Sequence, residues 1–463
     1  MEEFDAIILG SGQGGNPLAK KLSKEGLRVA LVESGFIGGT CVNDGCTPTK
    51  TLVGMAKDIS LASRAGKYGA TVNRDTVDYR SISHRKDEVV HYFRKGLEDS
   101  LIQDLNIKLF YGKGSFSGYK KLRVLSKNVD STTITAKKIF INTGARARIP
   151  DINGLQSVKY FTSRTLLELD CLPKHLLIIG GGHIALEFSQ IFRRMGSLVT
   201  IVERSSGLLP REDDDVASEV ESILRVDGIE IITDAAVRSV NAASDGSVSA
   251  EVMSSGRLLR LSGTHLLIAA GRVPNTEDLD LLKTGIKVDR HGYIPVNDHL
   301  ETTEPGIYAL GDVKGGASFT HVSYNDYVVV ADYLFGGKGF SARDRLIPYC
   351  LFIDPELGRV GLTEKDARRL GLDFFVAKMK ASFIARALET DETRGLLKAV
   401  VDNHTGMILG ASVLCSGGGE LMSLLQVAIM GGITYDQLRD AMFAHPTYAE
   451  AVNNLFSPIH IQR

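Results

Sequence analysis

The chain has 463 residues, of which 43% are hydrophobic and 24% charged, and its formal net charge is −1. This length and composition predict about three globular domains with a large buried core. The even charge balance, without a Lys/Arg block, gives no support for nucleic-acid binding. No apolar run approaches the roughly 18 residues of a membrane span, and the acidic start lacks the features of a secretory signal. We therefore expect a cytoplasmic protein with no membrane segment and no nucleic-acid partner.

The chain opens with a strand, a glycine loop, a helix and a second strand. The apolar run AIILG leads into Gly10-x-Gly12-x-x-Gly15, a helix is expected over 17–26, and the strand RVALVE ends at Glu33. Such glycines permit a tight turn, the approach of a pyrophosphate and close packing of the helix on the strand. The helix N-terminus can bind the phosphates, and the acid can accept the ribose hydroxyls. In this context the pattern predicts a dinucleotide site.

A close pair of thiols follows in the segment GGTCVNDGCTPTK. On a straight α-helix, residues at the spacing of Cys41 and Cys46 have Cα atoms roughly 8–9 Å apart, whereas a disulfide needs about 4.4–6.8 Å. The pair can therefore bridge only if the backbone bends, and Gly45 permits a bend. Pro48 suits the first turn of a helix, which leaves Cys46 near a helix N-terminus, where a thiolate is favoured.

Three interpretations of the thiol pair are open. A zinc site needs two further ligands, and no second pair of Cys or His at a suitable spacing is visible, so no metal site is expected. A structural staple is unusual in a reducing compartment. We favour a redox-active disulfide. The other cysteines stand singly beside apolar residues and are expected to be small buried hydrophobic residues: Cys171, Cys350 and Cys415.

The opening pattern returns in HLLIIGGGHIALEFSQIFRRMGSLVTIVER. Here Gly180, Gly182 and Ala185 hold the glycine positions, and Glu203 follows Gly180 at the interval that separates Glu33 from Gly10. The repeat predicts a second dinucleotide site, so that electrons could pass between two cofactors. The acidic run REDDD that comes next is expected to be a solvated surface segment.

Two later segments, KIFINTGA and HLLIAAGRVPNT, are strands that run into Gly144 and Gly271 and could return the chain under each nucleotide. In TTEPGIYALGDV, Asp312 stands at a strand end, where its carboxylate either holds a polyol or ribose hydroxyl or is an ordinary turn residue. Near the C-terminus, FAHPTYAE places His445 before a helix expected to begin at Pro446, with Glu450 in its first turn. The carboxylate could orient the imidazole as a base for a thiol; a lone histidine there is also common as a helix-cap residue.

Together these residues resemble the class I pyridine nucleotide–disulfide oxidoreductases, the family of dihydrolipoamide dehydrogenase, glutathione reductase and mercuric reductase. The resemblance spans essentially the whole chain and rests on markers in family order: GSGQGG, GGTCVNDGC, TGA, GGGHIALE, AAGRVPNT, ALGDV and AHPTYAE. It implies an α/β fold with two Rossmann-like dinucleotide-binding domains and a C-terminal α+β dimerisation domain. The implied boundaries are 1–150 with 275–345 for the FAD-binding domain, 151–274 for the NAD(P)-binding domain and 346–463 for the interface domain.

The resemblance also implies residue roles. Cys46 faces the flavin, Cys41 attacks the acceptor, and His445, oriented by Glu450, is the acid–base supplied by the partner subunit of a homodimer. Lys50 and Glu187 match a lysine and a glutamate that pair near the reactive flavin nitrogen. FAD is expected at Gly10, Gly12, Gly15, Glu33, Lys50, Gly114, Thr143, Gly144 and Asp312. NAD(P)H is expected at Gly180, Gly182, Glu187, Glu203 and Gly271. The apolar stretch LMSLLQVAIMGG becomes a buried helix.

The nicotinamide site has two features of its own. Glu203 favours NADH, because a carboxylate repels a 2′-phosphate, while Arg204 beside it leaves NADPH open. His183 stands where many relatives carry an aromatic gate over the nicotinamide pocket.

Other stretches most resemble the mercuric-reductase-like branch, which includes copper-associated flavoprotein reductases of reactive-chlorine resistance. The chain lacks the C-terminal cysteine pair with which mercuric reductases receive metal. We therefore do not expect mercury as the natural substrate. The resemblance to this branch implies a free-standing NAD(P)H-dependent reductase of a small disulfide, a quinone or a metal ion. The alternatives are a dihydrolipoamide dehydrogenase of a 2-oxo acid dehydrogenase complex and, from another class, a flavin-bound redox sensor.

Overall fold

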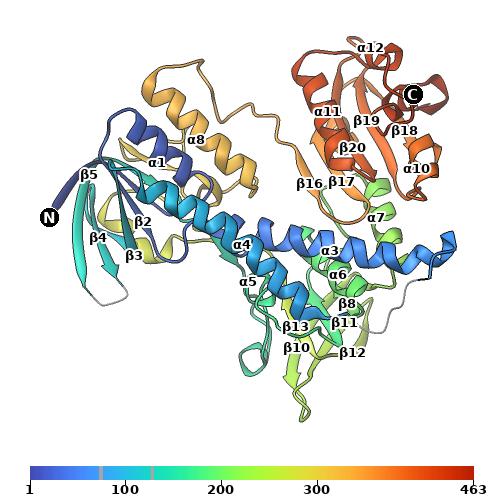
Figure 1. Ribbon diagram of the computed structural model, residues 1–463, viewed down its shortest axis with the longest axis horizontal. Coiled ribbons are helices and arrows are strands. Elements are labelled where there is room, and N and C mark those ends of the chain that lie inside the picture. Colours follow the sequence, from blue (N-terminus) through green and yellow to red (C-terminus); the bar gives the residue numbers. More distant parts are fainter. Residues whose placement is uncertain (72–76, 127–129, 463) are drawn as a thin grey trace. The chain divides into compact units, whose positions relative to one another are not determined.

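The structure is a computed structural model that describes residues 1–71, 77–126 and 130–462. It divides into two compact units, each assembled from separate stretches of chain (Figure 1). The first unit contains Met1–Thr51, Ser81–Arg148 and Gly271–Arg345, and the second contains Leu52–Arg80, Ile149–Ala270 and Leu346–Arg463.

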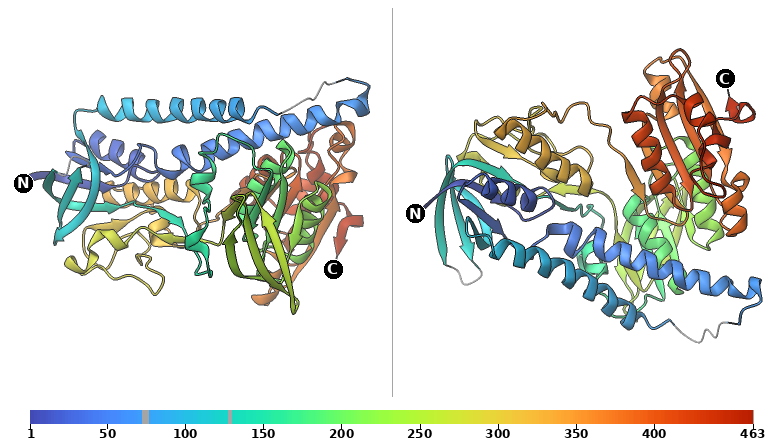
Figure 2. Two further views of the ribbon diagram at one scale, coloured as in Figure 1. Left: turned by 90° about the horizontal axis from the view of Figure 1, so that it is seen from below. Right: turned by 45° about the horizontal axis from the view of Figure 1, so that its top comes forward.

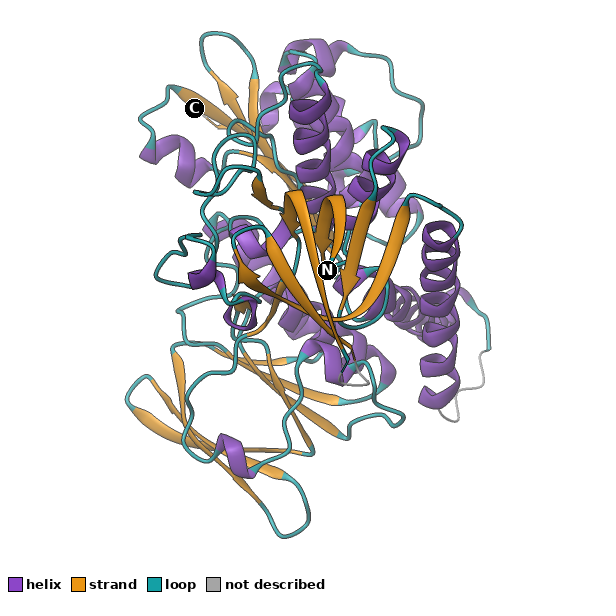
Figure 3. Ribbon diagram, turned by 90° about the vertical axis from the view of Figure 1, so that its left-hand side faces the viewer, coloured by secondary structure: helices purple, strands orange, loops and turns teal. Residues whose placement is uncertain are grey.

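The first unit is built on a parallel sheet in the order β3-β2-β1-β5-β15. The long strands β3 and β5 continue past this sheet, and β4 pairs with both of them in antiparallel fashion. Figure 3 shows strands of this unit in orange around the N-terminus. The strands are β1 (Glu2–Leu9), β2 (Val29–Glu33), β3 (Ile107–Gly118), β4 (Lys121–Ser126), β5 (Ser131–Ile141) and β15 (Ile307–Ala309), and a separate pair is formed by β6 (Ala145–Ala147) and β14 (Arg272–Pro274).

Both faces of this parallel sheet are covered, as is usual for such sheets. Ala6 and Ile8 of β1 pack with the α1 side chains Leu18 and Leu22, while the alternate residues of β1 pack into the core on the opposite face. Helix α1 (Gly15–Lys24) lies beside α8 (Thr320–Phe335) (Figures 1 and 2). The glycine loop therefore joins a buried strand to a helix that is packed on it.

The second unit contains a smaller parallel sheet in the order β13-β7-β8-β9. Its elements are β7 (His175–Ile179), α6 (His183–Met195), β8 (Leu198–Val202), α7 (Asp214–Val226), β9 (Glu230–Ile232) and β13 (His265–Ile268). An antiparallel sheet precedes β13 and consists of β10 (Ala235–Ala242), β11 (Val248–Ser254) and β12 (Arg257–Gly263). The strand, helix, strand order of the first unit is thus repeated here.

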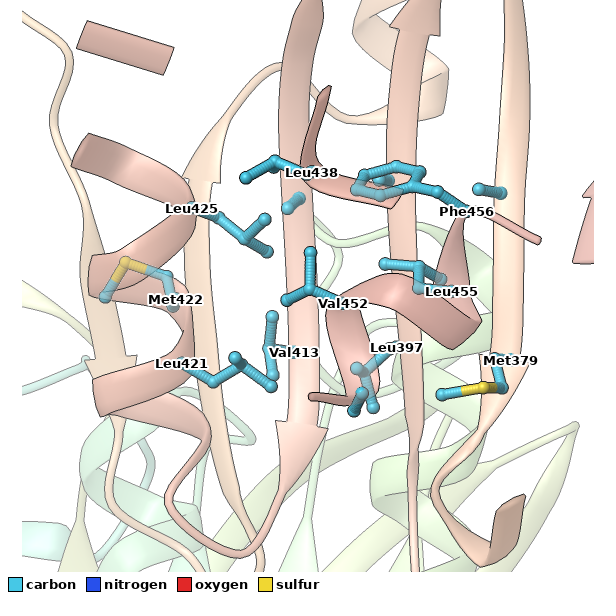
Figure 4. Packing of buried hydrophobic residues seen from close by; sticks show 14 of the residues in the cluster. Met379, Leu397, Val413, Leu421, Met422, Leu425, Leu438, Val452, Leu455 and Phe456 are labelled. Atoms are coloured by element: carbon cyan, nitrogen blue, oxygen red, sulfur yellow. The ribbon is translucent and has the colours of Figure 1, made fainter. Parts of the chain in front are cut away.

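The C-terminal part of the second unit is a six-stranded antiparallel sheet in the order β16-β17-β20-β19-β18-β21. Figure 4 shows Leu421 and Leu425 of a neighbouring helix pointing toward Val413 of the sheet, beside Val452 and Leu455. The elements are β16 (Tyr349–Leu351), β17 (Glu356–Gly361), β18 (Phe374–Lys380), β19 (Leu396–Asp402), β20 (Ile408–Cys415), α11 (Gly418–Met430), α12 (Tyr435–Asp440), α13 (Ala451–Leu455) and β21 (Ile461–Gln462).

The remaining α-helices lie between strands in the chain: α2 (Gly39–Asn43), α3 (Cys46–Arg64) and α4 (Tyr79–Ile102) between β2 and β3, α5 (Ser163–Leu166) between β6 and β7, α9 (Glu364–Arg369) between β17 and β18, and α10 (Ala385–Glu389) between β18 and β19. No helix among the described residues is long and apolar enough to cross a membrane. The predicted α/β fold class is confirmed. The three-domain boundaries stay a prediction, because the second unit holds both the second parallel sheet and the C-terminal sheet.

Two local predictions need correction, and a third stays open. The helix expected from Pro446 begins only at Ala451, because the Thr447 hydroxyl donates to Ala444 O and accepts from Glu450 N, which forms a turn ahead of the helix. The stretch expected as a buried helix is the helix α11, which buries one face within the single chain and leaves Val427 and Met430 exposed at 66% and 71%; its burial against a partner subunit stays a prediction.

The second correction concerns the acidic run REDDD. Glu212 and Asp213 are buried, and Asp213 accepts hydrogen bonds from the backbone N–H groups of Glu364 and Lys365. The Lys398 ammonium lies 3.1 Å from Asp213. A charge run is therefore no guide to exposure where the fold supplies N–H donors and cations.

Candidate active site

The first glycine loop closes on the acid at the end of β2. Gly10 has φ +98° and donates its N–H to Val32 O at 2.8 Å. A Cβ at Gly10 would lie 2.3 Å from Asn142 O, so only glycine fits. The Glu33 carboxylate accepts the N–H groups of Ser11 at 2.9 Å and Gly35 at 2.7 Å. The two N–H groups hold the carboxylate at the rim of the loop.

The second loop repeats this geometry. Gly180 has φ +113° and donates to Val202 O at 2.9 Å, and its Cβ would lie 2.4 Å from Ala269 O. The Glu203 carboxylate accepts the N–H groups of Gly181 at 2.6 Å and Ser205 at 2.7 Å. Gly182 is the N-cap residue of α6. The matching intervals in the sequence therefore correspond to matching hydrogen bonds.

A second set of predicted residues of the first unit meets across β6 and β14. The Thr143 hydroxyl donates to Asn275 O at 2.9 Å, and the Asn275 side chain donates to Thr143 O at 2.8 Å. The Asp312 carboxylate accepts a hydrogen bond from Arg272 at 3.1 Å, and burial raises the pKa of Asp312 above its ordinary value despite that arginine. The Thr143 hydroxyl, the Asn275 amide and the Asp312 carboxyl, which is bound by Arg272, thus form a polar group of side chains beside Gly144, which has φ +70°.

The thiol pair lies where α2 meets α3. Cys46 is the first residue of α3, and its Sγ lies 3.2 Å from the hydroxyl oxygen of Thr320, the first residue of α8. Both cysteines are in the reduced form in the structure. The hydrogen bond with Cys46 and then burial raise the pKa of the Cys41 thiol far above its ordinary value. Cys41 therefore needs a base to become a nucleophile, whereas Cys46 lies at a helix N-terminus that favours a thiolate.

The redox segment is attached to the first glycine loop. Gly38 N donates to the Ser11 hydroxyl at 3.1 Å, and a Cβ at Gly39 would lie 2.7 Å from Gly12 Cα. A Cβ at Gly45 would lie 2.7 Å from Thr40 O, so the bend between the thiols needs this glycine. The predicted dithiol and the predicted phosphate loop thus share one packed site.

The histidine and glutamate near the C-terminus form a pair in the second unit. His445 Nδ1 lies 3.0 Å and 2.9 Å from the two carboxylate oxygens of Glu450. The carboxylate fixes the tautomer with hydrogen on Nδ1, which leaves Nε2 as an acceptor. The imidazole is exposed, as a base that serves a second chain must be.

The remaining predicted residues have simpler surroundings. The Glu187 carboxylate is buried and accepts Phe352 N at 3.0 Å; its pairing with Lys50 joins the two units and stays a prediction. Gly114 lies in β3, where a Cβ would be 2.5 Å from a methyl of Leu9. Gly271 has φ +106° and is exposed.

Other sequence expectations had mixed outcomes. Cys415 is buried as predicted, whereas Cys171 is exposed and Cys350 is only partly buried. The His183 ring packs against the Tyr349 ring, with centroids 5.1 Å apart. Thr320 and Arg272 were missed by sequence reasoning, because no local pattern connects them with Cys46 and Asp312.

Comparison with known proteins identifies the family. Residues 4–326 match the family described as pyridine nucleotide-disulphide oxidoreductase, and residues 347–456 match its dimerisation domain. The chain belongs to this family of oxidoreductases. The probable pyridine nucleotide-disulfide oxidoreductase RclA of Escherichia coli (strain K12) is 40% identical over 461 residues, which is 99% of each chain. The oxidoreductase is also 32% identical to a mercuric reductase of Staphylococcus aureus, over 97% of this chain and 81% of the relative.

A solved structure described as the Cu(II) complex of the HOCl-induced flavoprotein disulfide reductase RclA from Escherichia coli matches with a TM-score of 0.90 at 39% identity, over 98% of this chain and 99% of that chain. The family resemblance, its nearest branch and the reductase class predicted from the sequence are therefore confirmed. The oxidoreductase uses FAD and NAD(P)H and a redox-active disulfide, and its dimerisation domain supports a homodimer.

Proposed function

We propose that this oxidoreductase passes electrons from NADH through FAD to the Cys41–Cys46 pair and from there to a small-molecule disulfide, as a homodimer in the cytoplasm. The observation that carries the proposal is the thiol pair itself. Cys46 is the first residue of α3 and lies beside the Thr320 hydroxyl. The Cys41 thiol is hydrogen-bonded to Cys46, which raises the pKa of Cys41. One thiol is thereby suited to remain a thiolate and the other to accept and release a proton.

The residues around the first loop fit FAD. Asn16 is buried at the start of α1, and neither polar atom of its side chain has a hydrogen-bond partner among the described residues, which suits a site completed by a ligand. Beside Glu33, a cavity of about 380 Å³ is lined by Phe36 and Tyr111, where an adenine ring could pack. Gly12 leaves the backbone open to a pyrophosphate, and we assign Asp312 to hydroxyl groups of the cofactor.

The second loop fits a nicotinamide dinucleotide with a 2′-hydroxyl. The Glu203 carboxylate lies at the rim of the second loop and accepts a backbone N–H hydrogen bond there, as the Glu33 carboxylate does in the first loop. A carboxylate there accepts ribose hydroxyls and repels a 2′-phosphate, so we assign NADH as the donor. Gly180, Gly182 and the N-terminus of α6 would hold the pyrophosphate.

FAD, when bound, supplies a two-electron carrier between the hydride donor and the disulfide. The thiols then complete the reaction. Cys41 attacks one sulfur of the acceptor disulfide, and its proton goes to His445 of the partner subunit, oriented by Glu450. The departing acceptor thiolate takes that proton. Cys46 next attacks the sulfur of Cys41, which releases the second acceptor thiolate and closes the Cys41–Cys46 disulfide, and the released thiolate takes one proton from solvent. In total, NADH, one proton and an acceptor disulfide become NAD⁺ and two thiols.

A metal ion is a second candidate acceptor. The relative RclA was solved as a Cu(II) complex, and thiolates are soft ligands that suit copper. The dithiol carries two electrons, so each turnover would reduce two Cu(II) ions. No cluster of three or more ligating side chains occurs in the part of the chain that the structure describes. A metal acceptor would therefore meet the dithiol itself. Quinones remain a third acceptor class.

The proposal is tested with the purified flavoprotein. Two-electron reduction by NADH should give a long-wavelength absorption band that depends on the Cys46 thiolate. Cys46→Ser should abolish the band, Cys41→Ser should retain a band, and turnover of disulfides should be lost in both. Cys171→Ser is the matched control, because Cys171 is an exposed thiol outside the site, and it should change neither property. A Cys46→Ser variant that keeps the band would overturn the proposal.

An acceptor screen separates the alternatives. Lipoamide-dependent reduction of NAD⁺ at high rates would assign the chain to a 2-oxo acid dehydrogenase complex. NADH-driven reduction of other disulfides or of Cu(II) supports the free-standing enzyme. Reduction of the flavin without turnover of any acceptor would indicate a redox sensor. A sensor does not need the His445–Glu450 pair, which argues against that outcome.

A further inference from the structure

One fully buried carboxylate of the first unit has no role in the chemistry described above. Asp326 of α8 is 0% exposed. Its Oδ2 accepts the backbone N–H of Gly311 at 2.7 Å and lies 3.4 Å from the Lys314 ammonium. Its Oδ1 lies 2.8 Å from Nη1 of Arg345. A buried charge is costly unless it is paired and hydrogen-bonded, and both of its oxygens meet that condition.

The N–H that Asp326 binds belongs to a constrained turn. Gly311 has φ +71°, and a Cβ there would lie 2.8 Å from the Ser323 hydroxyl oxygen. The same turn, Gly311–Lys314, presents Asp312. Asp312 also accepts a hydrogen bond from Arg272 at 3.1 Å. The direction of the Asp312 carboxylate therefore depends on where Gly311 is held.

We propose that Asp326 is a positioning residue of the flavin site, which sets the Gly311–Asp312 turn so that Asp312 meets hydroxyl groups of the bound FAD. Asp326 does not touch the cofactor in this assignment; it acts through the Gly311 N–H. Without its charge, Lys314 and Arg345 are left as buried or nearly buried cations with no carboxylate between them, and the turn shifts. The inference rests on the proposed function, because it takes Asp312 as a ligand of FAD.

The test compares two aspartates of one helix. In Asp326→Asn, we expect at least tenfold weaker binding of FAD to the apoprotein, measured by quenching of flavin fluorescence, and a shifted flavin absorption maximum. Asp332→Asn is the matched control, since Asp332 also lies in α8 and also accepts backbone N–H groups, those of Lys338, Gly339 and Phe340. It should change FAD affinity less than twofold. Equal affinities in the two variants would overturn the proposal.

A second variant covers the case in which Asp326→Asn does not fold. Arg345→Gln removes the cation on the far oxygen of Asp326 and leaves Gly311 and Asp312 unchanged. We expect FAD binding to weaken about threefold to tenfold, with an unchanged KM for NADH in the FAD-saturated enzyme. Unchanged FAD affinity in a folded Arg345→Gln protein would contradict the assignment. If the unsubstituted protein itself bound no FAD, the proposed function would fail instead, so the two failures are distinguishable.

Discussion

The two glycine loops follow one plan, yet they differ in what they are attached to. In both, a glycine at positive φ donates to the neighbouring strand, and a glutamate accepts two backbone N–H groups. In the first loop, the Ser11 hydroxyl also donates to Glu33 at 2.7 Å and accepts from Gly38. In the second, the equivalent position is Gly181, where a Cβ would lie 2.7 Å from a methyl of Leu208.

The third glycine position differs as well. A Cβ at Gly15 would lie 2.2 Å from Gly10 O, whereas Ala185 carries a methyl and is fully buried. The first loop is therefore more tightly packed at its third position, and it also contacts the dithiol segment through Ser11 and Gly12.

The largest expected effect comes from substituting the residue at the third glycine position of each loop, Gly15 in the first and Ala185 in the second. Gly15→Ala places a methyl against a backbone oxygen that cannot give way, so we expect loss of about 3 kcal/mol of unfolding free energy and loss of bound FAD. Ala185→Gly should cost about 1–2 kcal/mol, from helix propensity and one lost methyl, and keep FAD. Urea denaturation and flavin absorbance measure both. Equal losses in the two variants would contradict the difference in tightness.

A pH effect on stability is expected from Glu212 of the second unit, which follows the second loop. Burial raises the pKa of Glu212 to about 7 from an ordinary 4.5; its Oε2 has no hydrogen bond among the described residues, with Arg359 Nε 3.5 Å away. The folded state therefore holds this proton more tightly than the unfolded chain. The resulting stabilisation, about 3 kcal/mol, is complete below pH 4.5 and lost as the pH rises through about 7.

Glu212→Gln should remove this dependence, so its urea midpoint should fall less between pH 5 and pH 8 than that of the unsubstituted protein. Asp214→Asn is the control, because the Asp214 side chain is 93% exposed, and it should preserve the dependence. A Glu212→Gln protein with an unaltered pH profile would show that this carboxyl does not titrate in that range.

Substitution of the glutamates at the rims of the two loops, Glu33 and Glu203, should affect different cofactors. Glu203→Gln removes a charged acceptor worth about 1.5–3 kcal/mol, so we expect KM for NADH to rise at least tenfold, FAD content to stay unchanged and discrimination against NADPH to fall. Glu33→Gln should lower FAD affinity by a similar factor. Steady-state kinetics with both donors and flavin titration distinguish the outcomes. Loss of FAD in Glu203→Gln would show that the loops are not independent.

The smallest effect should come from the hydroxyl that ties the first loop to the dithiol segment. Ser11→Ala removes two hydrogen bonds and should cost about 1 kcal/mol of unfolding free energy, with a weaker long-wavelength band after reduction. Ser205→Ala is the counterpart in the second loop, where Glu203 is bound by the Ser205 backbone N–H, and it should change neither. A full-strength long-wavelength band in Ser11→Ala would show that the Ser11 hydroxyl does not couple the first loop to the thiols.

Much of the candidate site could be predicted from the sequence because its parts are local. The two glycine-to-glutamate intervals, the bend at Gly45 and the His445–Glu450 pair each span a short segment. The His445–Glu450 contact is formed, and the two glutamates lie at the rims of their loops, while their contacts with cofactors stay a prediction. Thr320, Arg272 and Asp326 could not be predicted, since they act on residues brought to them by sheet pairing and helix packing. The burial of Glu212 and Asp213 and the exposure of Cys171 were not predicted for the same reason.

By itself, the sequence determined the order of strands and helices, the two dinucleotide loops and the dithiol, because periodicity, glycine placement and spacing act over a few residues. Only the tertiary structure decided which distant groups complete them. It brought the N-terminus of α8 to Cys46, the guanidinium of Arg272 to Asp312 and a buried carboxylate to the turn at Gly311. Such contacts depend on how sheets and helices pack in three dimensions, and no spacing along the chain encodes that packing.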